Sequence, residues 1–162
     1  MNKTVIIYKS KYFSTKKYAG WLSIKTGADL YELSDIRIID LKKYQNIVFG
    51  GYIEDGYIKG FEFIKRNYDK IKDKKVVVFS VGLGLYNRDQ IINLNFTPRD
   101  KFKEIEYFEL LGDFNYSDLD LRDKFKIIYG NSKINSNLLD YKTSIINSKK
   151  ENLNEIIDRL ID

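Results

Sequence analysis

The chain is 162 residues long, contains no cysteine and no histidine, and carries a formal net charge of +5 at pH 7. Its length is that of about one domain, so we expect a single domain over residues 1–162. The missing residue types exclude disulfides, thiol nucleophiles and imidazole bases, and they remove the usual zinc and haem ligands. We therefore expect no metal site, and redox chemistry would need a bound cofactor.

The positive charge is distributed along the chain rather than gathered in one patch. Lysines are mixed with aspartates and glutamates, and even the basic run at 72–75 stands where a turn before a strand is expected. We therefore expect a solvated surface and no nucleic-acid partner. No apolar stretch approaches the ~20 residues that span a bilayer, and no signal-like segment begins the chain, so we expect a cytoplasmic protein.

The first strand and the first helix are expected on either side of a loop rich in hydroxyl groups. Residues 4–8 form an apolar, β-branched run that predicts a buried parallel strand, and apolar spacing predicts a helix over residues 15–26. Between them, Ser10, Ser14 and Thr15 would point at one spot, together with the N–H groups of the first helical turn. Such a junction is typical of a phosphate site. The alternative is that Ser14 or Thr15 only caps the helix.

The chain then alternates strands with helices almost to its end. Further strands are predicted over residues 29–33, 46–49, 76–80 and 104–110. Further helices are predicted over residues 60–68, 99–102 and 149–161. This alternation predicts right-handed βαβ units and a five-stranded parallel sheet with helices on both faces. We expect the first strand to be central and the last helix to pack against the sheet.

Residues 115–141 interrupt the alternation and are interpreted as an insertion that carries one short helix. Ser117 is the candidate cap of this helix. Its apolar and basic part contains Phe125, Ile127, Ile128 and Tyr129. Packing in the core is the expected role of these side chains, and peripheral contact with a membrane or with a partner is the alternative.

Glycine-rich loops follow two of the predicted strands. The loop at 50–60 begins with two glycines and contains Tyr52, and the loop at 80–87 contains Gly82 and Gly84. Glycine lets a backbone approach a flat ligand, and a tyrosine ring can stack on one. Each loop alone could be an ordinary turn. Together with the hydroxyl-rich first loop, and at the carboxyl ends of parallel strands, they predict a ligand site.

A dinucleotide-binding fingerprint does not explain these glycines. That fingerprint needs G-x-G-x-x-G directly after the first strand. Gly82 and Gly84 follow a later strand, and Asn87 stands where the third glycine belongs. A P-loop is excluded as well, because no lysine follows Gly56.

Six segments, taken in order, resemble the flavodoxin-domain proteins, and most closely the branch that includes the menaquinone-dependent protoporphyrinogen dehydrogenases. The segments are SKYFST at 10–15, IVFGGYI at 47–53, FEFIKRNYDKIKDKK at 61–75, VVVFSVGL at 76–83, LLGDFNYSDL at 110–119 and KKENLNEIIDRL at 149–160. The resemblance covers nearly the whole chain. It implies a single flavodoxin-like domain, an α/β three-layer sandwich with a five-stranded parallel sheet of order 2-1-3-4-5, and bound FMN.

The resemblance also implies which residues hold the FMN. Its phosphate would lie in the first loop, and its ring between the second and third loops. The first loop supplies Ser10, Lys11, Tyr12, Phe13, Ser14 and Thr15, of which Ser10, Tyr12, Ser14 and Thr15 would face the phosphate. The second loop supplies Gly51, Tyr52, Ile53 and Glu54, and the third supplies Gly82, Leu83 and Gly84.

Two residues depart from the family pattern. Phe13 stands where the family usually has glycine, so a bulky residue occupies a backbone position that can require positive φ. Glu54 stands where the family usually has an aromatic residue, and Tyr52 is the candidate substitute. The first departure predicts a suboptimal phosphate loop.

We interpret the chain as an FMN-dependent redox protein, either an electron carrier or an oxidoreductase of the protoporphyrinogen dehydrogenase type. Its partner would be another redox protein, a quinone or a porphyrinogen. The alternative is a flavodoxin-fold interaction module whose flavin binding is weakened or lost, as Phe13 and Glu54 would suggest. No catalytic side chain and no oligomeric state are predicted.

Overall fold

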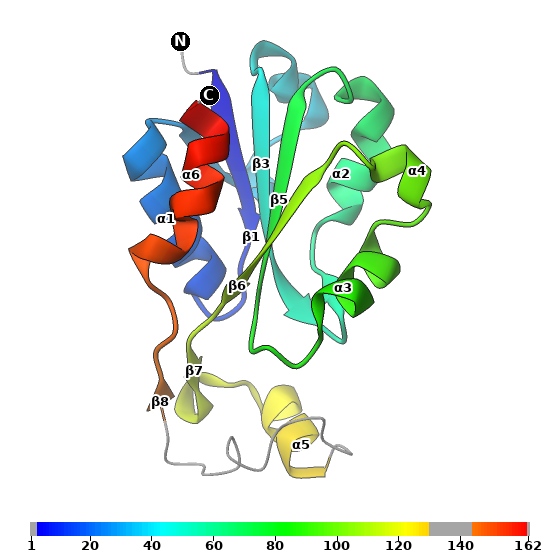
Figure 1. Cartoon of the computed structure of the whole chain (residues 1–162). Coiled ribbons are helices and arrows are strands. Elements are labelled where there is room, and N and C mark those ends of the chain that lie inside the picture. Colours follow the sequence, from blue (N-terminus) through cyan, green and yellow to red (C-terminus); the bar gives the residue numbers. More distant parts are fainter. Residues whose placement is uncertain (1–2, 130–143, 162) are drawn as a thin grey trace.

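The computed structural model describes residues 3–129 and 144–161, and it contains the expected parallel sheet (Figure 1). Its five parallel strands are β1 (Thr4–Lys9), β2 (Asp29–Glu32), β3 (Asn46–Glu54), β5 (Lys75–Gly82) and β6 (Glu106–Leu111). They follow the order β2-β1-β3-β5-β6, which is the predicted order 2-1-3-4-5. The two-residue strand β4 (Tyr57–Ile58) pairs antiparallel with the end of β3. The α/β flavodoxin-like fold class is therefore confirmed.

Helices cover both faces of the sheet, as expected. In Figure 1, α1 (Ser14–Thr26) and α6 (Asn154–Ile161) lie on one side of the sheet. The other side carries α2 (Glu62–Asn67), α3 (Arg88–Asn95) and α4 (Arg99–Phe102). None of the helices in the described part of the chain is long and apolar enough to cross a membrane.

The unbroken apolar strands contribute side chains to two separate hydrophobic cores, one on each face of the sheet. Successive side chains of a strand point to opposite faces, so a strand covered on both sides needs apolar residues at every position. Val5 and Ile7 of β1 belong to the core beneath α2, whereas Ile6 between them belongs to the core beneath α1 and α6. Ile156 of α6 is fully buried in that second core. The last helix therefore packs against the sheet, as expected.

The position of β1 in the sheet and the bounds of two elements differ from the prediction. β1 is an internal strand, but β3 rather than β1 occupies the middle of the sheet. The strand predicted from residue 104 begins at Glu106, because the preceding residues form the turn that follows α4. The last helix begins as a short 3-10 helix, Lys150–Leu153, and becomes α-helical at Asn154.

Helix α3 is an element that the sequence analysis did not predict. It is only eight residues long and five of its residues are polar, so its apolar periodicity is weak. Asn87 caps its start: the Asn87 side chain accepts a hydrogen bond from the backbone N–H of Gln90, and the Gln90 side chain accepts one from the backbone N–H of Asn87. This capping box stabilises the helix where hydrophobic spacing gives little signal.

The insertion forms a short hairpin and a helix outside the main sheet. Strand β7 (Phe114–Asn115) pairs antiparallel with β8 (Ser144–Ile145), and α5 (Leu121–Tyr129) follows β7. Residues 130–141 of the predicted insertion lie outside the described residues. The described part of the insertion contains a helix, as expected, but Ser117 does not cap it, since Ser117 lies in a separate 3-10 turn. The carboxylate of Asp120 accepts the N–H of Asp123 instead, at 2.8 Å.

The expected core role of the insertion is wrong for Phe125, which is 62% exposed. The side chains of Ile127, Ile128 and Tyr129 lie outside the described part of the structure. Phe125 is exposed because α5 lies beyond the end of the sheet, where neither core reaches (Figure 1).

Asp113, just after β6, joins the start of α1 to the chain that returns from the insertion. Its backbone N–H donates to Ser14 Oγ at 2.9 Å, and its carboxylate accepts from Lys17 Nζ at 2.5 Å. The same carboxylate accepts the N–H groups of Asn147 and Ser148 at 2.9 and 2.8 Å. Burial alone would raise the pKa of Asp113, but the hydrogen bonds from Lys17 and Ser148 outweigh it and lower the pKa to about 2.

Asp113→Asn is expected to lower the free energy of unfolding by about 1 to 2 kcal/mol near pH 7, because the amide loses the charge that Lys17 and the two N–H groups stabilise. A carboxyl whose folded-state pKa is lowered contributes stability above its unfolded pKa of 3.8 and loses it as the pH falls through about 2. Urea unfolding should show the full difference near neutrality and a shrinking one in acid.

The matched control for this measurement is Asp158→Asn, because Asp158 is an exposed carboxylate on α6. It is expected to change the unfolding free energy by less than about 0.5 kcal/mol. A difference between Asp113→Asn and the parent that persists unchanged at low pH would contradict the electrostatic account of Asp113.

Candidate functional site

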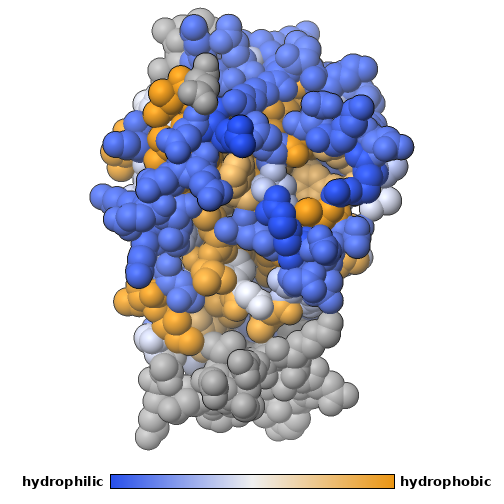
Figure 2. Space-filling model, in the orientation of Figure 1, coloured by the Kyte–Doolittle hydropathy of each residue, from blue (hydrophilic) through white to orange (hydrophobic). Residues whose placement is uncertain are grey.

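An open cavity of about 720 Å³ lies at the carboxyl ends of the strands. The three loops singled out from the sequence all contribute to it, and so do the end of β6 and the start of α5. Its volume falls in the usual range of small-molecule sites, about 300 to 1,000 Å³. The carboxyl ends of the strands lie in the lower part of Figure 1, and Figure 2 shows apolar surface in the same part of the visible face. The predicted convergence of the loops is therefore present.

Most of the predicted site residues line this cavity. They are Lys11, Tyr12, Ser14, Thr15, Tyr52, Ile53, Glu54, Gly82, Leu83 and Gly84. The three that do not line it are Ser10, Phe13 and Gly51. Ser10 Oγ accepts the N–H of Lys16 at 3.3 Å, so this hydroxyl serves the first turn of α1. A Cβ on Gly51 would come within 2.6 Å of the carbonyl oxygen of Lys59, so Gly51 is needed for the β3–β4 packing.

Phe13, rather than a serine or threonine, occupies the N-cap position of α1. Its φ of 65° lies in the left-handed region, and its side chain makes no cap hydrogen bond and is 73% exposed. The positive φ that the sequence comparison suggested is thus present with a bulky residue. The alternative that Ser14 or Thr15 caps the helix is wrong, because both lie inside the first helical turn.

The two hydroxyl residues of that turn have different surroundings. Ser14 Oγ accepts the backbone N–H of Asp113, so it holds the chain after β6 against α1. Thr15 is only 1% exposed and lines the cavity. The partial positive charge at the start of a helix lies at this same place. Thr15 is therefore the hydroxyl of the first loop best placed to meet an anionic group in the cavity.

Phe13→Gly is expected to raise the free energy of unfolding by about 1 kcal/mol. Positive φ costs an L-residue ~1 to 2 kcal/mol, and the greater freedom of glycine in the unfolded chain offsets part of that gain. The exposed ring of Phe13 loses little burial. Phe13→Ala is the matched control, because it removes the ring and keeps the strained backbone. Urea unfolding that shows equal gains for both variants would contradict the strain argument.

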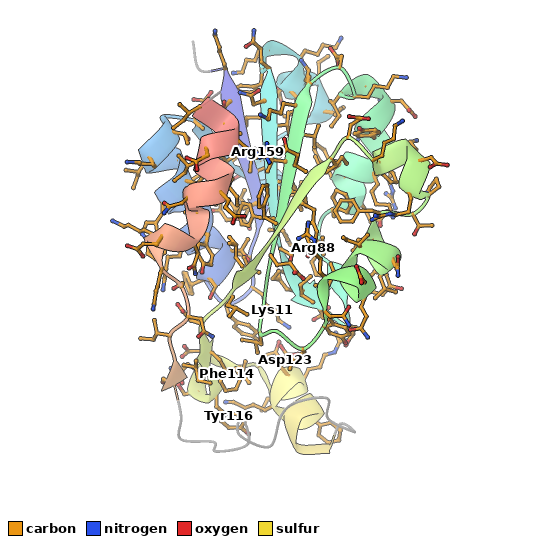
Figure 3. All side chains as sticks on the ribbon, in the orientation of Figure 1. Lys11, Arg88, Phe114, Tyr116, Asp123 and Arg159 are labelled. Carbon is orange, nitrogen blue, oxygen red and sulfur yellow. The ribbon has the colours of Figure 1, made fainter. Side chains whose placement is uncertain are left out.

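Lys11 of the first loop is surrounded by carboxylates. Its Nζ lies 2.7 Å from Asp123, 3.3 Å from Asp120 and 3.5 Å from Glu54. The Tyr12 hydroxyl donates to Asp123 at 2.6 Å and accepts the N–H of Asp120 at 3.1 Å. Figure 3 shows Lys11 and Asp123 near one another, where the sheet meets α5. The first loop and the start of α5 thus form one ionic cluster.

This cluster shifts the protonation equilibria of its members. Burial disfavours the charged ammonium of Lys11, but the hydrogen bonds and charges of Asp123 and Asp120 outweigh burial and raise the pKa of Lys11. Burial likewise favours the neutral form of Asp123, but the hydrogen bonds from Lys11 and Tyr12 lower the pKa of Asp123. Both side chains are therefore ionised at neutral pH, and the ammonium is already compensated.

The charge lining the cavity is opposite to the charge of the whole chain. The acidic lining residues are Glu54, Asp55, Glu109, Asp113, Asp118 and Asp123, and the basic ones are Lys11 and Arg88. Exposed charges more than about 10 Å away are largely screened at moderate salt, so the lysines spread over the surface do not cancel this local excess. A net charge of +5 therefore gives no guide to the field inside the cavity.

The far end of the cavity is formed by the loop after β5 and the start of α3. Gly84 has a φ of +75°, which glycine adopts without strain, and it follows the lining residues Gly82 and Leu83. Arg88 donates to the Tyr107 carbonyl oxygen at 2.7 Å and lies over the Tyr107 ring. The Tyr107 hydroxyl is bonded to Ser80 Oγ at 2.7 Å, and burial raises the pKa of Tyr107.

Sequence reasoning missed several residues of this site. Asp120 and Asp123 belong to the insertion, and Arg88 begins a helix that was not predicted. Lys11 was included in the first loop, but no residue near it in the sequence indicates that it pairs with Asp123, which lies 112 positions away. The only signal in 118–124 is a segment of charged residues interrupted by two leucines, and charged segments are usually solvated surface.

Comparisons with known proteins support the fold. The family described as "Flavodoxin domain" matches residues 5–133. A "putative flavoprotein" from Bacteroides eggerthii has a TM-score of 0.51 and 16% sequence identity, and the match covers 79% of this chain and 98% of that one. No curated protein matches the chain significantly.

Two further solved structures are similar to this chain at lower scores. Oxidised flavodoxin 2 from Bacillus cereus has a TM-score of 0.47 and 20% identity, over 67% of this chain and 85% of that one. A flavoprotein from Lactobacillus acidophilus, solved in complex with FMN, has a TM-score of 0.47 and 18% identity, over 68% of this chain and 93% of that one.

Proposed function

This chain belongs to the flavodoxin-domain family, and from that premise we propose that it binds FMN in the cavity at the carboxyl ends of the strands and works as a redox protein. The observation that carries the proposal is the convergence of three loops on one cavity. Thr15 comes from the start of α1, Tyr52 from the end of β3, and Gly82 from the end of β5. Ligands of open α/β sheets bind at this edge.

The residues present fit the two ends of FMN. Thr15 and the N–H groups at the start of α1 would hold the phosphate, since hydroxyls and the helix N-terminus both favour an anion. Tyr52 and the backbone of Gly82–Gly84 would flank the flat ring. When bound, FMN supplies the electron-transfer chemistry. The chain itself supplies orientation, and apolar side chains such as Leu110 keep water from the deep end of the cavity.

For the partner, we propose a quinone, a porphyrinogen or another redox protein. The resemblance to protoporphyrinogen dehydrogenases supports the first two. Exposed apolar side chains support all three, because Leu111, which lines the cavity, is 49% exposed, and Leu121 and Phe125 of the neighbouring α5 are 85% and 62% exposed. Large exposed apolar side chains at a site mouth are typical of contact with an apolar ligand, a partner or a membrane surface.

Thr15→Ala is expected to weaken FMN binding by about 1 to 3 kcal/mol, because a hydrogen bond to the charged phosphate is lost. Riboflavin, which lacks the phosphate, should bind the variant and the parent equally. Quenching of flavin fluorescence by added protein gives both affinities. The matched control is Thr26→Ala at the opposite end of α1, which should leave both affinities unchanged.

Two results would contradict this proposal in different ways. An equal effect of Thr15→Ala on FMN and on riboflavin would show that Thr15 does not contact the phosphate. If neither flavin binds to the parent protein or to any variant at micromolar concentration, the chain is an interaction module with the flavodoxin fold, which is the alternative function that the sequence left open.

A further inference from the structure

The start of α5 binds two side chains of the first loop: the ammonium group of Lys11 and the hydroxyl group of Tyr12. Lys11 and Tyr12 both bind Asp123, at 2.7 and 2.6 Å, and the N–H of Asp120 donates to the Tyr12 hydroxyl. Lys11 and Asp123 are well shielded, with side chains 23% and 18% exposed. Both line the same cavity as Thr15. The protein's own carboxylate therefore lies in the part of the cavity where a phosphate group would arrive.

A phosphate and these carboxylates cannot share Lys11 without a penalty. Asp123, Asp120 and Glu54 already place three negative charges within 3.5 Å of one ammonium group. A phosphate monoester adds a charge between −1 and −2 at neutral pH. Like charges this close disfavour each other strongly when they are partly buried. Either the phosphate binds weakly, or Asp123 leaves Lys11.

Asp123 is the member of the cluster that can leave, because the helix that carries it is not part of the main sheet. It lies in the first turn of α5, outside the main sheet, and Leu121 and Phe125 on either side of it are exposed rather than packed in a core. Glu54, in contrast, belongs to β3 and is also paired with Lys59 at 3.2 Å. Movement of the start of α5 would therefore cost little apolar burial at Leu121 and Phe125.

We propose that Asp123 competes with the phosphate of FMN for Lys11 and Tyr12, so that FMN binding is coupled to release of the start of α5. This inference rests on the proposed function. It makes Asp123 a specificity-determining residue: its carboxylate reduces the advantage of FMN over riboflavin, which has no phosphate to compete. It also explains how a first loop with a lysine and a tyrosine can be compatible with the neighbouring carboxylate of Asp123.

The test compares Asp123→Asn with Asp118→Asn, and measures FMN and riboflavin binding to each by fluorescence quenching. Asp118 is an exposed carboxylate that lines the cavity and is bonded to Ser117, so its variant removes one negative charge and keeps the Lys11 cluster. We expect Asp123→Asn to tighten FMN binding about tenfold, a change of ~1.4 kcal/mol, and to leave riboflavin within about twofold. Asp118→Asn should change FMN binding less, because its charge acts only at a distance.

Hydrogen exchange on the parent protein tests the coupling without any substitution. The N–H of Asp123 is bonded to the Asp120 carboxylate, so backbone amides in 120–125 report whether the start of α5 is in place. Saturating FMN should speed exchange there, and saturating riboflavin should not. Asp123→Ala provides a second variant in case Asp123→Asn does not fold, and it should shift the FMN-to-riboflavin ratio in the same direction, because it also removes the competing carboxylate.

The outcomes separate this inference from the proposed function. If FMN and riboflavin bind but Asp123→Asn leaves their ratio unchanged, the competition is wrong and FMN binding stands. If Asp123→Asn weakens FMN alone, then Asp123 holds Lys11 ready for the phosphate and the inference is reversed. Absence of binding by either flavin in the parent and in every variant removes the proposed function and the inference with it.

Discussion

Parallel pairing in register is the constraint on which the site depends. The ladders between β1, β3, β5 and β6 place four residues at one level of the sheet, namely Lys9, Gly51, Ser80 and Glu109. Because parallel strands all end at the same edge, the segments that follow these residues leave the sheet together. The cavity exists where they diverge toward helices on opposite faces. A slip of one residue would turn each apolar side chain to the wrong face, so the two cores keep the register and the site in place.

The electrostatic field inside the cavity is determined by the nearby charged groups rather than by the net charge of the chain. The chain is basic as a whole, yet Lys11 is paired with three carboxylates and acidic groups outnumber basic ones in the lining. Short distances and partial burial strengthen these contacts, whereas water and salt screen the lysines on the outer surface. The insertion is therefore an electrostatic part of the site, although it lies outside the main sheet.

The loop between β1 and α1 has a strained backbone, and neighbouring hydrogen bonds hold it in place. Phe13 keeps a left-handed backbone without a side-chain cap, a conformation that costs free energy locally. Ser10 satisfies one amide of the first helical turn, and Asp113 binds Ser14 and Lys17 from the far side. The surrounding hydrogen bonds thus hold a loop geometry that the residue at position 13 does not favour.

The sequence by itself determined the fold class, the five parallel strands and the three loops that converge, because apolar runs and turn residues are local signals of structure buried on both faces. Its resemblance to a family also identified the unusual backbone at Phe13. Only the tertiary structure decided that Ser10 serves the helix, that α3 exists, and that Lys11 is bound by Asp123. Lys11 and Asp123 are 112 positions apart, so their pairing leaves no periodic pattern from which it could be predicted. The other two features are local, but α3 has weak apolar periodicity and the role of Ser10 rests on one hydrogen bond to the backbone of Lys16.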